Sequence, residues 1–360
     1  MGLTVSVWVV VVFFVCLLGL YIYWTAMLDE WEKHRKVCPC DRCDKWTNEV
    51  RAQCRLETGL EPLDQEKKIE GGFSVLMYEA KIVADSVCSE SRLTTMQLTH
   101  PRIVHAEFMT HCMFARNASS SRAIPFSRVL QNVQGDPFVP VHWGQNQKGM
   151  QAENELSLED QEIARMVWMD ARNSAMEFAK KMHGLGVHKQ VVNRLLEPWS
   201  WITVCVTGDA GAWSNYFALR CHPDAQPDIQ KQAYMAQLAY YCSKPKQLNV
   251  GQWHTPYILP SEKGNFNDQE TEVMVSVGRC ARTSYLTQEG SHDIQADLVL
   301  CDRLTSHTPM HASPLEHVAK AMGDGYRYAK YIGWKSYRHF KMNEYVTDFK
   351  PNHPDLVVKG

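Results

Sequence analysis

The stretch "HCMFARNASSSRAIP", residues 111–125, gathers the kinds of side chain that bind an anion. Three consecutive serines, residues 119–121, stand between Arg116 and Arg122, with Asn117 before them and Pro125 after them. Hydroxyl groups, backbone amides and the fork of an arginine together suit a phosphate. The same composition is also typical of a polar turn. This stretch alone therefore leaves both interpretations open.

Length and composition set limits on the function. The chain has 360 residues, enough for one large or two ordinary domains with a substantial core. Its formal net charge is −2, so we expect no nucleic-acid partner, and any phosphate site must be a local feature. Eleven Trp, fourteen Tyr and twelve Phe argue against a disordered chain.

The twelve cysteines are scattered through a long chain, which favours a reduced, intracellular protein over a disulfide framework. The one cluster is "CPCDRC", where Cys38, Cys40 and Cys43 follow His34. This cluster fits either zinc ligands or a solvated loop. No second cysteine pair follows at a usual finger spacing, and Cys54 is the only nearby additional thiol. We therefore predict no metal site.

Residues 5–24, "VSVWVVVVFFVCLLGLYIYW", form an apolar segment long enough to cross a bilayer as a helix. The segment lacks the basic start and small-residue cleavage site of a signal peptide. Lys33, Arg35 and Lys36 follow it, which predicts a catalytic domain in the cytoplasm, anchored to the membrane by one helix. The alternative is that translation begins at Met27 and the whole protein is soluble.

The pattern of the chain predicts four parts. These are a transmembrane helix at 1–26, a charged, cysteine-containing linker at 27–72, a catalytic domain at 73–345 and a loose tail at 346–360. The segment from Phe73 to Cys88 mixes apolar and polar residues in partial alternation, which predicts a first strand. Pro101 then stands at a helix start, and residues 131–155 are predicted to form a long polar loop.

The clearest predicted helix begins after Ser157. Ser157 and Asp160 resemble a capping box, and Gly184 and Gly186 end the pattern. We expect its apolar stripe to face the core; the stripe consists of Ile163, Met166, Val167, Ala171, Ala175, Phe178 and Met182. Two further helices are predicted on either side of "HPDAQP", residues 222–227. There is no internal repeat, dinucleotide fingerprint or P-loop.

Several separated motifs resemble those of the flavin-dependent thymidylate synthases. The family signature is Arg-His-Arg-x-x-Ser-x-Asn-Glu-x-Ser-x-Arg-Tyr, and "THCMFARNASSSRA" looks like a degenerate copy of it. "WSNYFALRCHPDAQPDI" resembles the Asn-Phe-x-x-Leu-Arg element, and "NRLLEP" resembles the Ala-Arg-x-x-Leu-Pro segment. "CARTSY" and "HASPLEH" resemble the Ala-Ala-Arg-x-Ser-Tyr and His-x-x-Pro-Phe-Glu-His elements. Together these motifs span residues from about 75 to 340.

The motif order and three positions depart from the common pattern. "CARTSY" and "HASPLEH" follow the other motifs instead of preceding them, as in a circular permutant, an order that resembles phage-type members. Thr110 and Cys112 stand where the family has arginine, and Ala118 stands where it has glutamate. A thiol offers one weak donor where arginine offers several, so the resemblance implies weakened flavin binding at Cys112 unless Arg116 compensates.

The resemblance implies a fold and an activity. The fold would be α+β (α/β), like that of thymidylate synthase complementing proteins, with an antiparallel sheet flanked by long helices. The activity would be methylation of dUMP to dTMP, with methylenetetrahydrofolate as carbon donor and FAD and NADPH as reductants. The assembly would be a homotetramer.

The resemblance also implies site residues. Arg220 would be catalytic, because its charge would stabilise the electron-rich form of the uracil. The dUMP-binding residues would be Glu107, Ser120, Ser121, Arg122, Arg194 and Arg220. The FAD-binding residues would be His111, Cys112, Asn117, Asn215, Ser284, His311 and Ser313. No protein nucleophile is needed, because the flavin carries the difficult chemistry.

Functions of other classes also fit the sequence. A related enzyme could make another 5-substituted dUMP, such as a hydroxymethyl form. A chain with a decayed site could bind the nucleotide without turnover. A membrane scaffold would account for residues 5–24 and "CPCDRC" but not for the motifs downstream.

Overall fold

The computed structural model describes residues 68–69, 73–74, 78–152, 154–286 and 293–341. All of them belong to one of the two units into which the chain divides, residues 64–360. The membrane segment predicted at 5–24, the cluster at Cys38, Cys40 and Cys43, and the tail at 346–360 lie outside the described residues.

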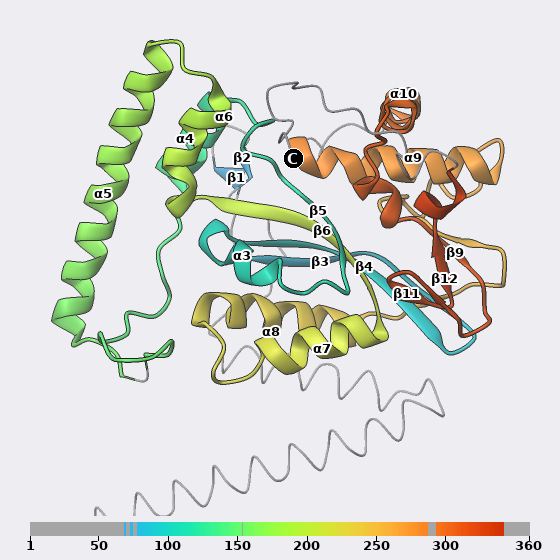
Figure 1. The fold of residues 1–360 in the computed structure, drawn as a ribbon, viewed down its shortest axis with the longest axis horizontal. Coiled ribbons are helices and arrows are strands. Elements are labelled where there is room, and N and C mark those ends of the chain that lie inside the picture. Colours follow the sequence, from blue (N-terminus) through green and yellow to red (C-terminus); the bar gives the residue numbers. More distant parts are fainter. Residues whose placement is uncertain (1–67, 70–72, 75–77, 153, 287–292, 342–360) are drawn as a thin grey trace, which may run out of the picture. The chain divides into compact units, whose positions relative to one another are not determined.

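The centre of this unit is a five-stranded sheet with the order β5-β6-β4-β3-β7 (Figure 1). Strands β3 and β4 form a hairpin through Ser89 and Glu90, where Ser89 has a φ of 52°. Strand β6 pairs antiparallel with both β4 and β5, and the short β7 runs parallel to β3. The strands are β3 (Glu79–Cys88), β4 (Ser91–Pro101), β5 (Ala115–Ala118), β6 (Trp201–Asp209) and β7 (Lys246–Gln247).

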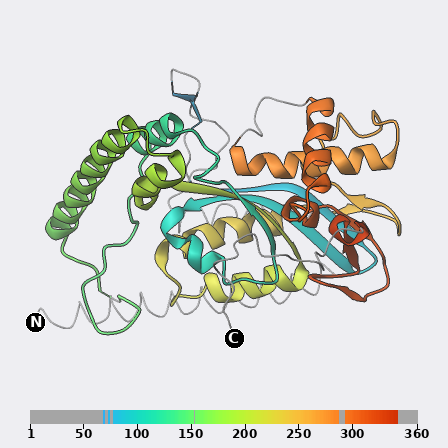
Figure 2. The same cartoon turned by 45° about the horizontal axis from the view of Figure 1, so that its top comes forward.

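One face of the sheet is apolar and is covered by two helices, α7 (Ala210–Arg220) and α8 (Pro227–Cys242). Alternate residues of β6, namely Ile202, Val204 and Val206, pack there with Trp213 of α7. Side chains on a strand alternate between faces, so Thr203, Cys205 and Thr207 lie on the opposite face. That face is also buried, and α9 (Gln269–Arg282) lies over it (Figure 2).

The long helix α5 (Leu158–Gly184) packs beside the sheet and not on it. It contacts α4 (Phe126–Gly135), α6 (Lys189–Val192) and the 3-10 helix η2 (Asn193–Trp199) through a second apolar cluster. The Ser157 side chain accepts a hydrogen bond from the Asp160 amide, so the predicted cap is confirmed. Of the predicted stripe, Ala175 and Met182 pack into this cluster, whereas Ile163, Met166, Val167 and Phe178 are exposed.

The remaining elements complete the unit. Two short antiparallel pairs, β1 with β2 and β10 with β11, and a three-stranded antiparallel sheet β12-β9-β8 lie outside the central sheet. Their bounds are β1 (Lys68–Ile69), β2 (Phe73–Ser74), η1 (Arg102–Val104), α3 (His105–Phe108), β8 (Trp253–His254), η3 (Thr283–Tyr285), α10 (Ile294–Ser306), η4 (Ser313–Glu316), β9 (Ala319–Ala321), β10 (Arg327–Tyr328), β11 (Tyr331–Ile332), β12 (Trp334–Ser336) and η5 (Tyr337–Phe340).

The fold predicted from the sequence needs correction. The sheet is mixed and not antiparallel throughout, because β7 joins it parallel to β3. Helices of 11 and 16 residues cover its apolar face, whereas the 27-residue α5 packs on η2. The prediction also included a membrane-spanning helix, and within the described residues no helix combines the length and apolar character needed to cross a bilayer. Finally, the loop predicted to begin at 131 starts after α4 ends at Gly135.

Candidate functional site

Arg220, the last residue of α7, anchors a polar cluster with the segment around α3. Its Nε donates to Nε2 of His111 at 2.9 Å, and its Nη1 donates to the Glu107 carboxylate at 3.2 Å. Its Nη2 reaches the Glu107 carbonyl oxygen and the Thr110 hydroxyl, each at 3.2 Å. All three guanidinium nitrogens are thus held by residues more than a hundred positions earlier in the chain. The predicted residues Glu107, His111 and Arg220 are therefore brought together.

The contact with Arg220 fixes the protonation state of His111. Because its Nε2 accepts a hydrogen bond, the ring carries its proton on Nδ1 and is neutral. Burial, then Arg220 and Arg116, lower the pKa of His111 to about 4. The cationic form would place a third positive charge beside two guanidinium groups. His111 therefore acts here as a neutral acceptor that orients Arg220.

Positive charge continues from Arg220 along the same surface. Arg116 interacts electrostatically with both His111 and His105, and Arg102 with His105. The Nη1 of Arg116 donates to the Met109 carbonyl oxygen at 2.6 Å. Arg116 also interacts electrostatically with Cys112, whose exposed thiol contacts the Thr110 carbonyl oxygen at 3.4 Å.

Two arginines share a single carboxylate at the other end of this surface. Glu197 accepts hydrogen bonds from Nε of Arg102 at 2.8 Å and from Nη1 of Arg194 at 3.0 Å. Arg220 and Arg116 extend this group of guanidinium side chains, and Arg116 also interacts electrostatically with a third carboxylate, Glu316. Permanent positive charge of this kind suits a phosphate.

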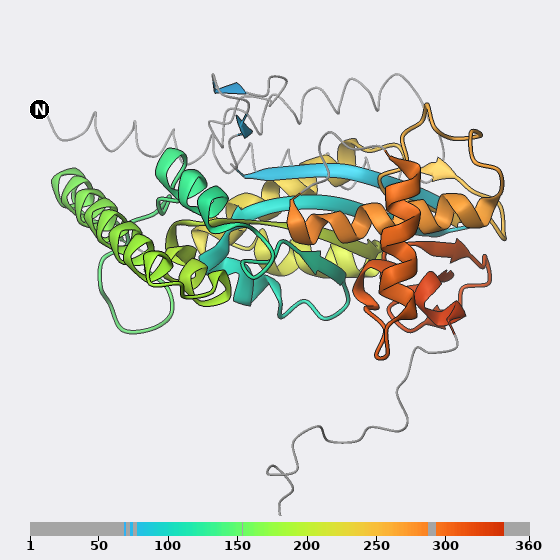
Figure 3. The ribbon, with the colours of Figure 1, turned by 90° about the horizontal axis from the view of Figure 1, so that it is seen from above.

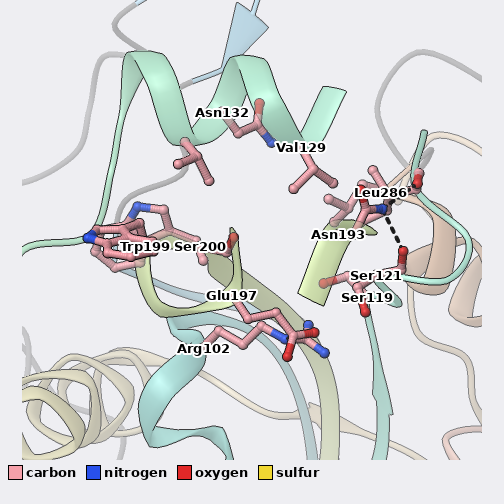
Figure 4. Close-up of a pocket in the computed structure, with 13 residues that line it drawn as sticks. Arg102, Ser119, Ser121, Val129, Asn132, Asn193, Glu197, Trp199, Ser200 and Leu286 are labelled. Carbon is pink, nitrogen blue, oxygen red and sulfur yellow. Dashed lines mark hydrogen bonds and ion pairs between the residues drawn. The ribbon is translucent and has the colours of Figure 1, made fainter. Parts of the chain in front are cut away.

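The serine turn lies against the same end of the surface. Nδ2 of the fully buried Asn193 donates to the carbonyl oxygens of Ser121, at 2.7 Å, and Ile124, at 3.1 Å (Figure 4). The Oδ1 of Asn193 has no hydrogen-bond partner among the described residues. Nζ of Lys189 donates to the Ala123 carbonyl oxygen at 2.7 Å. The carbonyl groups of the turn are thus held from inside the protein.

A small cavity of about 30 Å³ opens beside this turn. Its polar lining includes Arg102, Ser119, Ser121, Asn132, Asn193, Glu197 and Ser200, and Figure 4 shows Arg102 and Glu197 side by side below it. One water molecule needs at least about 10–15 Å³ of such space, so the cavity has room for one or two waters and not for a nucleotide.

A third group of predicted residues joins β5 to the end of α9. The Ser284 hydroxyl donates to Oδ1 of Asn117 at 3.2 Å, and the Ser120 amide donates to the Ser284 carbonyl oxygen at 3.0 Å. Nδ2 of Asn117 donates to the Cys280 carbonyl oxygen at 2.7 Å. These contacts hold β5 and the serine turn to η3. Asn117 and Ser284 therefore already have partners within the protein.

The other predicted residues lie apart from these clusters. Arg122 is exposed, and no ion pair joins its side chain to another described residue. Asn215, His311 and Ser313 are also exposed, on α7, before η4 and in η4. The His311 ring makes an edge contact with His307, at 5.3 Å between centroids. The structure therefore does not assemble all the residues assigned to FAD into one enclosed pocket.

The chemistry of this donor set fits a flavin dinucleotide only in part. Exposed hydroxyl, amide and imidazole groups at Asn215, His311 and Ser313 can bind phosphates or ring edges. His111, Asn117 and Ser284 would have to share their present partners. A dinucleotide held by this set would lie on the surface of a single chain.

Sequence reasoning missed three residues of the site, namely Arg102, Glu197 and Asn193. Arg102 stands directly after Pro101, and Glu197 lies inside "NRLLEP", the motif that was used to place Arg194. The signal was available, since an acidic residue three positions after an arginine in a helix is a common ion pair. Asn193 gave no such signal, because its partners are backbone atoms.

Comparison with known proteins gives a limited result. No family model matches the chain, and no curated protein matches it. Among solved structures, it is similar to a UMP/dUMP methylase PolB from Streptomyces cacaoi bound with 5-Br dUMP, with 18% identity, a TM-score of 0.36, and coverage of 41% of this chain and 66% of that one. The same enzyme bound with 5-Br UMP gives 18% identity, a TM-score of 0.36, and coverage of 41% and 69%. Likeness this limited carries no inference about activity.

Proposed function

We propose that this chain is a nucleotide-modifying enzyme that methylates dUMP to dTMP. The proposal takes its substrate from the resemblance of the motifs. The observation that carries it is the guanidinium group of Arg220, which four hydrogen bonds fix against Glu107, Thr110 and His111. Arg220 and His111 come from two separate motifs and are in contact, as expected if both motifs contribute to one site.

The arginine-rich surface matches the two demands of dUMP. A phosphate dianion needs permanent positive charge and hydrogen-bond donors, and we assign this role to Ser120, Ser121, Arg122 and Arg194. Methylation at C5 needs the uracil ring to be electron-rich at that carbon. A guanidinium group that is already oriented stabilises negative charge on the ring oxygen and nitrogen without reorganising during the reaction. We assign that role to Arg220, held in place by Glu107 and His111.

The one-carbon donor would be methylenetetrahydrofolate, and FAD reduced by NADPH would supply hydride. We assign FAD binding to His111, Cys112, Asn117, Asn215, Ser284, His311 and Ser313. Because these groups enclose no single pocket within one chain, we propose that a neighbouring subunit of a homotetramer covers the flavin. Neutral His111 keeps Arg220 in position, and no side chain of this chain acts as a nucleophile.

The test is an assay of purified full-length protein with dUMP labelled with tritium at C5. We expect tritium release that depends on methylenetetrahydrofolate, NADPH and FAD, with dTMP identified by mass spectrometry. A hydroxymethyl product would show that the enzyme hydroxymethylates dUMP at C5 instead of methylating it. Binding of dUMP without tritium release under these conditions would mean that the site binds the nucleotide without turnover.

Arg122→Lys tests the phosphate assignment. Loss of the planar fork should weaken dUMP binding by about ten- to a hundredfold, and FAD binding should change much less. Isothermal titration calorimetry measures both. The matched control is Arg303→Lys, another exposed arginine, which stands on α10 outside the motif sequences and should bind dUMP normally. Equal loss of both ligands in Arg122→Lys would make the serine turn a structural element.

A further inference from the structure

The last part of the described chain holds a concentration of positive charge that the overall balance conceals. Residues 319–341 contain six basic residues and one acidic residue, a net charge of +5, whereas the whole chain carries −2. Glu316 pairs with Lys330 at 2.9 Å and with Arg338 at 2.6 Å. Four other cations form no ion pair with any described residue, namely Lys320, Arg327, Lys335 and Lys341. The net charge of the whole chain therefore says little about the partner that this region attracts.

Two of these lysines lie in a row with a tryptophan across the small sheet β12-β9-β8. Trp253 of β8 is paired with Lys320 of β9, which is paired in turn with Lys335 of β12. Residues directly opposite each other on antiparallel strands project from the same face of a sheet. Ala319 and Ala321, the neighbours in β9, are buried in an apolar cluster on the other face, whereas the three side chains of the row are partly exposed. The row therefore lies on the outer face of this sheet.

Aromatic rings from η5 extend this row. The Phe340 ring lies 5.3 Å from the Trp253 ring between centroids, and Nζ of Lys335 lies 4.6 Å from the centre of the Phe340 ring. The Tyr337 ring lies 5.8 Å from that of Trp253, and Nζ of Lys341 lies 4.4 Å from the centre of the Tyr337 ring. Phe340 is the most open of the three rings, with 42% of its surface exposed. We call these six residues the lysine–aromatic surface: Trp253, Lys320, Lys335, Tyr337, Phe340 and Lys341.

We propose that the lysine–aromatic surface binds single-stranded nucleic acid. Proteins bind single strands by combining basic side chains, which contact the phosphates, with aromatic rings on which the bases stack, and the face of a sheet can present both. Phe340 and Trp253 would contact bases. Lys320, Lys335 and Lys341 would contact phosphates. A lysine over an exposed ring is held there only weakly, so it can turn toward a phosphate when a base covers the ring.

The surface favours a single strand over other anionic partners. Duplex DNA would satisfy the lysines only, because its bases are stacked on one another and are not free to cover a ring. An acidic peptide would likewise leave the face of the Phe340 ring without a stacked partner. A single strand offers both a chain of phosphates and free bases, which matches the lysines and the rings together. This inference does not rest on the proposed function, since no residue of the surface is assigned to dUMP or FAD.

Fluorescence anisotropy of the full chain with labelled oligo(dT) of about 12 nucleotides, and separately with oligo(U), tests the proposal. Three lysines on phosphates should make the logarithm of the association constant fall against the logarithm of salt concentration with a slope of about −2. That slope is a loss of about twentyfold between about 50 and 200 mM salt. Lys320→Gln with Lys335→Gln should weaken binding and reduce the slope to about −0.7. A duplex of the same length should bind at least about fivefold more weakly, because it leaves Phe340 without a stacked base.

Phe340→Leu separates stacking from charge. It keeps an apolar side chain but removes the ring, so it should weaken binding at least about fivefold without changing the salt slope. The matched controls lie on α5, which Figures 1 and 3 show at the opposite end of the described unit from β9 and β12. There, Nζ of Lys181 lies 5.3 Å from the centre of the Phe178 ring, which is 59% exposed. Phe178→Leu, and Lys180→Gln with Lys181→Gln, should leave binding unchanged.

The proposal is overturned if the wild-type chain binds neither oligonucleotide at low salt, or if the double lysine variant keeps the wild-type affinity. A duplex bound as tightly as the single strand would also overturn it, because charge alone would then account for binding. Capture of the chain by phosphatidylserine vesicles but not by oligonucleotides, lost in the double lysine variant, would assign the surface to a membrane instead. Circular dichroism checks that each variant is folded, and if Phe340→Leu is not, the double lysine variant and the duplex decide the outcome.

Discussion

At the scale of single residues, neutral His111 explains how Arg220 is held in one orientation. A protonated ring could not accept the 2.9 Å hydrogen bond from Nε of Arg220, and the low pKa of His111 prevents protonation at neutral pH. The Glu107 carboxylate accepts a hydrogen bond from Nη1 of the same guanidinium group. The charge of Arg220 therefore stays available to a bound ligand in a fixed direction.

Cys112 gives a prediction at this scale. The resemblance alone implies weak FAD binding, but Arg116 lies close enough to interact electrostatically with Cys112. We therefore expect Cys112→Arg and Cys112→Ser each to change the FAD dissociation constant by less than about threefold. Arg116→Gln should raise that constant by about ten- to a hundredfold, the loss typical of one charged hydrogen bond. Fluorescence titration with FAD measures all three variants.

The unfolding temperature of Arg116→Gln serves as the control, because Arg116 also donates to the Met109 carbonyl oxygen. A weaker flavin affinity in a variant of unchanged unfolding temperature points to lost binding and not to a damaged fold. Tenfold tighter binding in Cys112→Arg, with Arg116→Gln neutral, would restore the expectation drawn from the sequence.

The residue types of the candidate site were visible in the sequence, but their partners were not. The family resemblance led to Glu107, His111 and Arg220, which do meet. The same reasoning placed Arg122 and His311 beside them, where the structure leaves both exposed. Spacing in sequence determines which residues share a motif, whereas contacts between motifs depend on how the strands pair. That pairing is not encoded in any single motif.

At the scale of elements, the caps and ends of the helices were predicted correctly from the sequence, whereas the surfaces against which they pack were not. The cap at Ser157, the end of the helix near Gly184, and the two helices around "HPDAQP" were all predictable from side chains close in sequence. The exposed stripe of α5 shows the limit. An apolar stripe indicates that a face will be covered, but it does not distinguish the core from another surface.

The crossing of α9 over α10 gives a second prediction. A Cβ atom added at Gly278 would lie 2.4 Å from the Asp297 carbonyl oxygen, which is backbone and cannot move aside cheaply. Asp297 also pairs with Arg279 and Arg282, at 2.9 and 2.6 Å, so a shift there would disturb a buried ion-pair network. Gly278→Ala should therefore lower the free energy of unfolding by about 1–3 kcal/mol or more.

The matched control for this prediction is Gly184→Ala. Gly184 is the last residue of α5, and an added Cβ would meet no atom within 4 Å. Alanine favours helix by up to about 1 kcal/mol over glycine, so this variant should be neutral or slightly stabilised. Urea unfolding compares the two. If both variants had the same free energy of unfolding, α9 and α10 would be able to move apart enough to accept the added Cβ atom at residue 278.

At the scale of the whole unit, the second face of the sheet is held by polar groups. The Ser86 hydroxyl contacts Nδ1 of His254 at 2.8 Å, and Nε2 of the same ring contacts the Thr95 hydroxyl at 2.8 Å. Thr95 contacts Thr207 at 2.6 Å, and Thr207 contacts Nδ1 of His317 at 2.8 Å. This chain links β3, β8, β4, β6 and the end of η4. Alternation along the strands predicts two faces, but not that the second is buried against polar partners.

Buried neutral histidines make acid sensitivity a property of the whole unit. Burial lowers the pKa of His254 to about 3, with Lys263 and His317 adding to the effect, and it also lowers the pKa of His100 to about 3 and that of His105 to about 4. In the unfolded chain these rings titrate near 6.5. Between the two values the unfolded chain binds more protons, so the free energy of unfolding must fall as pH falls below about 6.5.

Substitution of His254 measures the share of this acid sensitivity that comes from one histidine. Between pH 7 and pH 5 its neutral ring should account for roughly 2 kcal/mol of lost stability, since one proton difference is worth about 1.4 kcal/mol per pH unit. His254→Gln should be less stable than wild type at pH 7, because the contacts to Ser86 and Thr95 are disturbed, but its stability should fall less steeply with acid. Urea unfolding at pH 7, 6 and 5 measures both slopes, and His222→Gln, at an exposed position, should keep the wild-type slope. Parallel slopes for wild type and His254→Gln would show that the ring of His254 is not the group that binds a proton on unfolding.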